Sequence, residues 1–79
     1  MLGRSPATGD NPAMDIRLNG AHFALPAGST ISDLLVAQGL ADRRVAVEVN
    51  GEIIPRSRHS THPLTDDDVV EIVHALGGG

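Results

Sequence analysis

Three consecutive glycines, Gly77, Gly78 and Gly79, close the sequence directly after an apolar run. Ordering three glycines costs more conformational entropy than ordering any other tripeptide, and a fold has no need of them after its last strand. A tail without side chains can enter a narrow channel, and three residues extend about 10 Å into it. The Gly79 carboxylate, ionised at neutral pH, can attack the α-phosphate of ATP to form an acyl-adenylate, whose carbonyl then accepts a sulfur nucleophile. The sequence therefore predicts Gly79 as the reacting residue, with an inert, frayed terminus as the alternative.

The other residue types restrict the chemistry of the rest of the chain. The 79 residues include no cysteine, and all six basic residues are arginines, which excludes a thiolate nucleophile, a thiolate zinc site and a Schiff-base lysine within this sequence. No nucleophile–base pair can be named. We therefore predict that the protein is not an enzyme and binds no cofactor of its own.

Two histidines and three aspartates lie close together in the second half of the chain. His59 and His62 are three residues apart and shortly precede Asp66, Asp67 and Asp68. These residue types bind metal ions, but no third nitrogen or sulfur ligand is assured. Aspartates also form turns. We therefore predict a solvated turn over 66–68 and no metal site.

Charge and hydropathy limit the classes of partner. The formal net charge of −4 disfavours nucleic acid. No stretch approaches the roughly 20 apolar residues of a membrane span, and the first residues lack the apolar run of a signal peptide. We expect a cytoplasmic protein that binds neither nucleic acid nor membranes.

Composition divides the chain into three parts. Residues 1–13 carry prolines and glycines without periodicity, and they predict a disordered extension or a tag. A single folded domain is expected over 14–76, followed by the flexible glycine tail 77–79.

Periodicity within the domain predicts an α+β fold. Apolar and polar residues alternate in the strands, and one segment has helical spacing. Two Asn-Gly pairs, at 19–20 and 50–51, are typical of hairpin turns. A mixed sheet of four to five strands, covered on one face by the helix and with the last strand beside the first, suits this order of elements. The expected strands are 14–19, 21–25, 44–49, 53–54 and 69–75, and the expected helix is 30–38.

The parity of the strands also predicts an outer surface next to the tail. Val73 and Ala75 share the outer face of the last strand, and Ala46 points outward from the third. Outward aliphatic residues beside a reactive tail predict a small apolar docking patch, and Arg56 and Arg58 are expected to meet an acidic rim on the partner. The alternatives are scattered surface apolar residues and a solvated arginine.

Together these segments resemble the ThiS family, the sulfur carrier proteins of thiamine biosynthesis. The resemblance extends over 14–79 and rests on an N-G-x-x-x-P-R segment (50–56), a D-x-D-x-x-E-[IV]-[IV] strand (66–73) and the terminal glycines. It implies a ubiquitin-like β-grasp fold. Two positions depart from the family pattern: Asp67, where the family often has glycine, and His59, in a stretch where relatives often carry tryptophan.

The resemblance implies the following roles. A ThiF-type adenylating enzyme uses ATP and magnesium to adenylate Gly79, while Gly78 forms part of the functional pair and Gly77 serves as a spacer. A cysteine desulfurase or a rhodanese-type protein supplies persulfide sulfur, and thiazole synthase takes the sulfur from the resulting thiocarboxylate.

Two further interpretations stay open. The small subunit of molybdopterin synthase shares the fold and the tail, and it predicts a complex with a large synthase subunit. A non-catalytic β-grasp interaction module predicts that the tail is inert.

Overall fold

Two hairpins with a helix between them build the larger part of the fold. The computed structural model describes residues 12–74, and the predictions for 1–11 and for 75–79, including Ala75 and the glycine tail, lie outside the described residues. The first hairpin joins β1 (Ala13–Leu18) to β2 (Ala21–Pro26), and the second joins β3 (Val45–Val49) to β4 (Glu52–Ile54). Asn19, Gly20, Asn50 and Gly51 all have positive φ, as the predicted Asn-Gly turns require.

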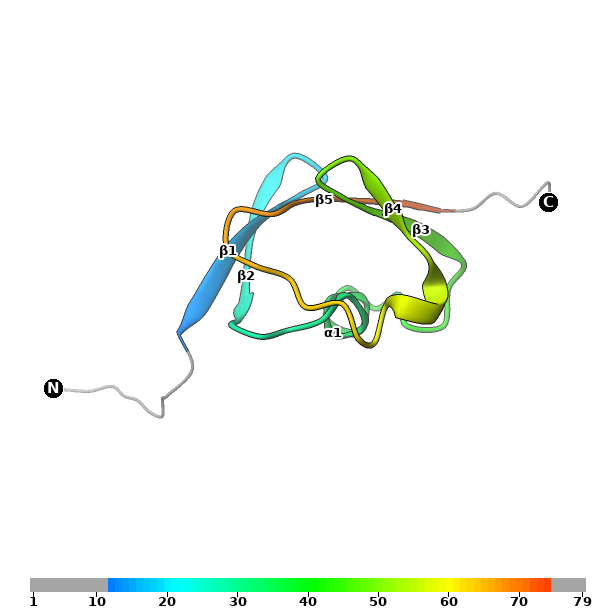
Figure 1. The fold of residues 1–79 in the computed structure, drawn as a ribbon, viewed down its shortest axis with the longest axis horizontal. Helices are drawn as coiled ribbons and strands as arrows, with labels where there is room; N and C mark the ends of the chain where they lie inside the picture. The colour runs from blue at the N-terminus through cyan, green and yellow to red at the C-terminus, as the bar shows by residue number, and fades with distance from the viewer. Residues whose placement is uncertain (1–11, 75–79) are drawn as a thin grey trace, which may run out of the picture.

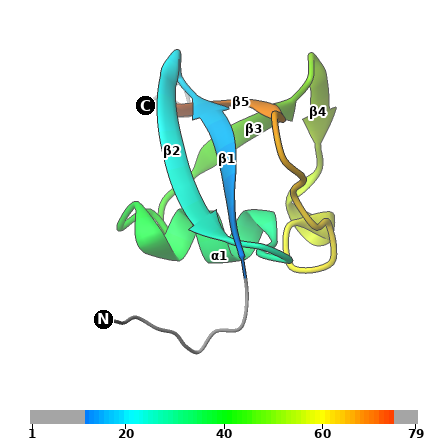
Figure 2. The ribbon, with the colours of Figure 1, turned by 90° about the vertical axis from the view of Figure 1, so that its left-hand side faces the viewer.

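The last strand, β5 (Val69–His74), joins the two hairpins into one sheet. The strand order is β2-β1-β5-β3-β4, with β5 parallel to β1 and antiparallel to β3. The predicted mixed sheet, with the last strand beside the first, is therefore confirmed. Figures 1 and 2 show the single α-helix, α1 (Ile31–Ala37), lying across one face of this sheet.

Hydrogen bonds satisfy the backbone amides at the start of helix α1. Thr30 is the N-cap: its side chain accepts from the Asp33 amide, and the Asp33 carboxylate accepts from the Thr30 amide. The two hydrogen bonds together form a capping box. Gly39 follows the helix with φ of 74°, a left-handed conformation that favours glycine.

The segment between β4 and β5 supports the helix. It begins with a short 3-10 helix, η2 (Arg56–Arg58), and then runs along the start of α1. The Ile31 amide donates to the His62 carbonyl, and the Ser32 amide donates to the His59 carbonyl. Leu64 anchors this segment in the core, where it is buried.

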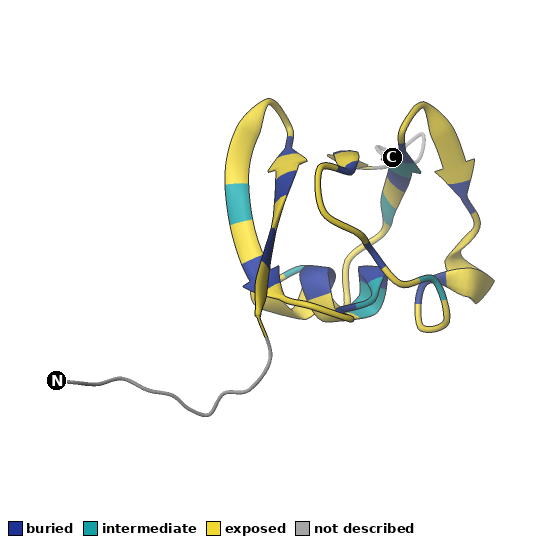
Figure 3. Ribbon diagram, turned by 60° about the vertical axis from the view of Figure 1, so that its left-hand side comes forward, coloured by how far each residue is buried: buried dark blue, intermediate teal, exposed yellow. Residues whose placement is uncertain are grey.

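The core lies between the inner face of the sheet and α1. Figure 3 shows buried residues alternating with exposed ones along the strands, as the period of two requires. Since Phe23 is the only aromatic residue, this core is aliphatic. Its buried members are Met14, Ile16, Leu18, Leu25, Ile31, Leu34, Leu35, Val47, Val49, Ile54, Leu64, Val70 and Ile72.

Candidate functional site: the end of β5 and the outer sheet face

The central strand carries the chain from the middle of the sheet to the predicted tail. β5 is hydrogen-bonded on both sides, and its last described residue, His74, stands opposite Val45 at the start of β3. β1 pairs only with Val69 and Val70, so the end of β5 that leads to the tail is paired with β3 alone. Gly77, Gly78 and Gly79 themselves lie outside the described residues.

Two of the predicted docking residues lie side by side on the outer sheet face. Val73 is 58% exposed, and Ala46 stands directly opposite it on β3 and is also exposed. Directly opposed residues on one face of an antiparallel pair are in contact distance. The outward orientation predicted for both residues is thus confirmed, while Ala75 lies outside the described residues.

Sequence analysis missed a third apolar residue of this face. Ile53 on β4 is 65% exposed and stands opposite Glu48, two residues along β3 from Ala46. Such diagonal neighbours lie within reach of long side chains. The Ile53-Ile54 pair contained the signal, because adjacent strand residues point to opposite faces and only one of the two can be buried. We call Ala46, Ile53 and Val73 the outer patch.

Two carboxylates stand beside the outer patch. Glu48 and Glu71 are opposed on β3 and β5, on the same face as Val73. Like charges directly opposite each other on a sheet repel. Of the acidic and basic side chains in residues 12–74, the structure pairs only Asp15 with His22, so neither glutamate has a basic partner there.

Arg56 does not lie with the outer patch. It begins η2 and lines a pocket together with Val45 and His59. The side chain of Val45 belongs to the inner face of β3, opposite to that of Ala46. The structure therefore brings Ala46 and Val73 together and places Arg56 at a separate site.

The aspartate run forms a turn, as predicted, but it is not simply solvated. Asp68 is only 8% exposed, and its carboxylate accepts from the Thr65 amide, the Thr65 hydroxyl and the Asn50 side-chain amide at 2.9–3.0 Å. Asp66 accepts from the Asp15 amide at 2.7 Å. The prediction of a solvated turn is wrong for Asp68, because a carboxylate with three donors can be buried without losing its hydrogen bonds.

Asp67 takes a backbone conformation that favours glycine. Its φ is 71°, within the left-handed region that residues with side chains adopt at a cost. This conformation gives a physical reason for the glycine that the resemblance associates with this position. Aspartate tolerates the region better than most residues, so the substitution preserves the turn.

His59 has a structural role that no sequence pattern indicated. Its side chain is 5% exposed, and Nε2 lies 2.9 Å from the Ile54 carbonyl oxygen. A carbonyl only accepts, so Nε2 carries the hydrogen and donates. Within the described residues, no three histidine, cysteine or acidic side chains gather as metal ligands would, and His59 and His62 form no such group.

One further property bears on location. The helices within residues 12–74 include none with the length and hydropathy needed to span a bilayer.

Comparisons with known proteins place these features in context. The model of the ThiS family matches residues 15–79. A crystal structure titled thiamine biosynthesis protein (ThiS), from Geobacter metallireducens, matches with a TM-score of 0.73 and 30% identity, covering 84% of this chain and 100% of that chain. Sulfur carrier protein ThiS of Bacillus subtilis is 50% identical over 50 residues, which are 63% of this chain and 76% of that protein.

Two larger proteins also match. Thiazole synthase of Magnetococcus marinus is 41% identical over 66 residues, which are 84% of this chain and 20% of that protein. A second thiazole synthase, from Paramagnetospirillum magneticum, is 39% identical over the same length. The chain thus spans about a fifth of the length of these two relatives. The structural likeness confirms the predicted ubiquitin-like β-grasp fold.

Proposed function

The chain belongs to the ThiS family of sulfur carrier proteins in thiamine biosynthesis, and we propose that it carries sulfur as a thiocarboxylate on Gly79. The observation that carries this proposal is the family match through Gly79, on a fold whose central strand runs toward the glycine tail. In this role the protein is a co-substrate that supplies no catalytic group.

The chemistry needs two steps at one carboxylate. A Gly79 carboxylate oxygen attacks the α-phosphorus of ATP bound by a ThiF-type adenylating enzyme, and pyrophosphate leaves. A persulfide from a cysteine desulfurase or a rhodanese-type donor then attacks the acyl carbonyl, and AMP leaves. A second thiol on the relay cleaves the sulfur–sulfur bond, which releases the thiocarboxylate and forms a disulfide on the relay. ATP and magnesium thus belong to the partner enzyme, and the carrier holds no cofactor.

The recipient of the sulfur is proposed to be thiazole synthase. The two thiazole synthases that match this chain over 66 residues support that pairing. The glycines of the tail suit transfer between enzymes, because a backbone without side chains passes through a narrow entrance.

The outer patch is proposed as the docking surface for these partners. Val73 and Ala46 form an opposed pair beside the end of β5, and Ile53 extends the apolar area across β3. Ala75 continues the parity of Val73 in sequence. A partner that covers this area lies next to the point from which the tail leaves the sheet. Arg56 lies apart from it, so the docking proposal does not require that residue.

The test of the carrier role is a mass measurement. The full chain is incubated with the ThiF-type enzyme of its own organism, magnesium ATP, a cysteine desulfurase and cysteine, and its intact mass is recorded. We expect one oxygen at the C-terminus to be replaced by sulfur, and the product to be consumed when thiazole synthase and its substrates are added. An unchanged mass would contradict the carrier role.

Two variants separate the carboxylate from the docking surface. A chain with one residue added after Gly79 should stay unmodified, because the carboxylate is moved beyond its position. Val73→Asp should lower kcat/KM for adenylation about tenfold, because it buries a charge in the interface. The matched control is Val36→Asp on α1, which is 65% exposed and lies away from the outer patch. Equal effects at the two positions would reject the outer patch as the docking surface.

A further inference from the structure

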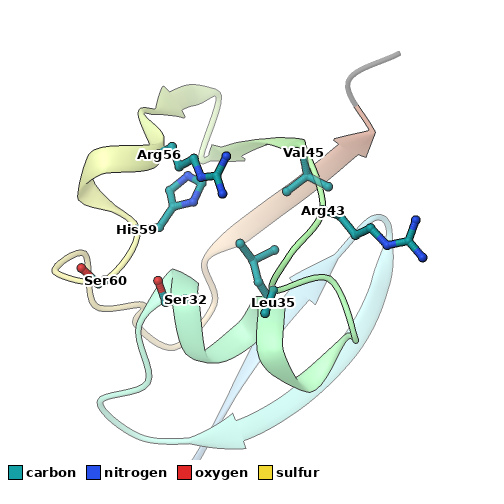
Figure 4. Close-up of a pocket in the computed structure, with 8 residues that line it drawn as sticks. Ser32, Leu35, Arg43, Val45, Arg56, His59 and Ser60 are labelled. Carbon is teal, nitrogen blue, oxygen red and sulfur yellow. The ribbon is translucent and has the colours of Figure 1, made fainter. Parts of the chain in front are cut away.

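A pocket on the helix side of the molecule is lined by two arginines and by no acidic residue. It has a volume of about 180 Å³ and lies between α1, the segment that leads into β3, and η2 with the turn that follows it. Figure 4 shows its side chains arriving from these three segments. They are Ser32, Leu35, Ala41, Arg43, Val45, Arg56, His59 and Ser60.

The only full charges that line this pocket are positive. Arg43 and Arg56 approach it from different segments, and no aspartate or glutamate contributes to its wall. Within residues 12–74, the structure gives neither arginine an ion pair. Two arginines that have no ion-pair partner within residues 12–74 therefore give the pocket lining a positive charge, in a chain whose net charge is −4.

The floor of the pocket is held rigidly by His59. Its ring donates to the Ile54 carbonyl, while its own carbonyl accepts from the Ser32 amide at 2.9 Å, so one buried residue joins β4 to α1. Leu35 is also buried, and Val45 is half-buried. His59, Leu35 and Val45 thus form the ordered part of the wall, while Arg43, Arg56 and Ser60 are exposed.

Two hydroxyl groups add neutral donors to the site. Ser32 is half-buried at the start of α1, and Ser60 is exposed on the turn after η2. Among the side-chain hydrogen bonds within residues 12–74, none involves either hydroxyl. Both line the pocket and are free to donate into it.

We propose that this pocket binds a small inorganic oxyanion of the phosphate class, held by Arg56 and Arg43 with help from the Ser32 and Ser60 hydroxyls. Guanidinium groups present paired donors that match phosphate oxygens, and hydroxyls complete such a set. A volume of about 180 Å³ is below the roughly 300–1,000 Å³ of pockets for drug-sized ligands, which favours an ion over a nucleotide.

The two arginine side chains differ in the direction of their guanidinium groups. In Figure 4 the Arg56 guanidinium lies near the His59 ring, whereas the Arg43 guanidinium points away from the centre of the pocket. Arg56 is therefore the preformed half of the site, and Arg43 closes on the anion through a change of rotamer. The site is independent of sulfur transfer, because it uses none of the tail or outer-patch residues.

The experiment is a titration of inorganic phosphate into the full chain, monitored through its amide chemical shifts. Sodium chloride keeps the ionic strength constant. We expect saturable shifts at Ser32, Arg43, Arg56 and Ser60. Removing one charge-assisted contact should weaken binding about tenfold in Arg56→Gln and in Arg43→Gln. Thermal unfolding of each variant checks that the exposed substitutions leave the fold intact.

The sequence offers matched controls for both arginines. Arg58→Gln on η2 and Arg44→Gln beside Arg43 remove the same charge from residues that do not line the pocket. They should change the affinity less than twofold, since only general screening is altered. Shifts that stay linear, or equal losses in the variants and their controls, would overturn the proposal.

Other anions define the class of ligand. Sulfate and pyrophosphate should compete with phosphate, because they present the same tetrahedral oxygens. Acetate should not compete at equal concentration, because it offers only one carboxylate to two guanidinium groups. Equal binding of acetate would assign the pocket to carboxylates and overturn the phosphate assignment.

Discussion

The two Asn-Gly turns have the same backbone and the same task, yet one is connected to far more of the molecule than the other. Asn19 and Asn50 have φ of 49° and 53°, and the glycines after them have φ of 87° and 85°. Each asparagine ends a strand that pairs with β5, and each side-chain oxygen accepts from a β5 amide: Ile72 at 2.8 Å and Val69 at 2.9 Å.

In both turns the side chain stands in for the main chain. The Asn19 backbone amide donates to the Val70 carbonyl, and the Asn50 backbone amide donates to the Val69 carbonyl. If each strand continued, the backbone carbonyl of the asparagine would accept the next hydrogen bond from β5. The backbone turns away at positive φ, and the side-chain oxygen accepts the β5 amide in its place. Each ladder is thereby extended by one hydrogen bond beyond its strand.

The difference lies in the other end of the side chain. The Asn50 side-chain amide donates to the buried Asp68 carboxylate at 3.0 Å, and the same carboxylate accepts from Thr65. The Asn50 turn and the turn before β5 therefore share one hydrogen-bond network. The Asn19 amide group reaches only the Ile72 carbonyl at 3.4 Å. Both turns lie beside residues 69–72 of β5, one on each side, and only the Asn50 side chain also connects its turn to a second turn.

The largest expected effect comes from removing the carboxylate that distinguishes the two turns. Asp68→Ala leaves three donors without an acceptor and should lower the free energy of unfolding by about 3 kcal/mol. Urea denaturation measures this change. Asp42→Ala removes the same charge from an exposed loop residue and should change the stability by less than about 0.5 kcal/mol. Similar values for the two variants would mean that the Asp68 network contributes nothing.

A smaller effect separates the two asparagines. Glycine accepts positive φ, so Asn50→Gly and Asn19→Gly remove only the side-chain hydrogen bonds; we expect losses of about 2 and about 1 kcal/mol. A double-mutant cycle sharpens the comparison: Asp68→Ala should couple to Asn50→Gly by at least about 0.5 kcal/mol and should be additive with Asn19→Gly. Equal coupling in both cycles would remove the distinction.

The smallest effect tests the feature that the turns share. At Gly20 and Gly51 an added methyl group meets no atom within 4 Å, so alanine introduces backbone strain alone. Each substitution should cost about 1 kcal/mol. Thermal unfolding of both variants should therefore give equal shifts. A clear difference would show that the two turns are not alike even in their backbone.

Local pattern was sufficient to predict most of the fold. Alternation placed β1 and β3, and the Asn-Gly pairs located both hairpins within a residue or two. The first strand begins at Ala13, one residue earlier than expected, and the helix is one residue shorter at each end. Parity alone placed Val73 and Ala46 outward, because neither prediction depends on which strand lies alongside.

What could not be predicted depends on partners distant in sequence. Asp68 is buried because Asn50, 18 residues away, donates to it, and an aspartate in a polar run otherwise indicates a solvated turn. The pocket gathers Arg43 and Arg56 from segments that no periodic pattern relates. The placement of Gly79 lies outside the described residues, so its role stays a prediction.

The position of β5 also governs when the molecule can assemble. The β1–β2 and β3–β4 hairpins share no strand pairing, and each meets the other only through β5. During synthesis both hairpins leave the ribosome first and wait for residues 69–74. Two-stranded hairpins have little stability alone, so the finished sheet forms in a single late step. A chain interrupted before Val69 lacks both the strand that joins the two hairpins and Val73 of the outer patch.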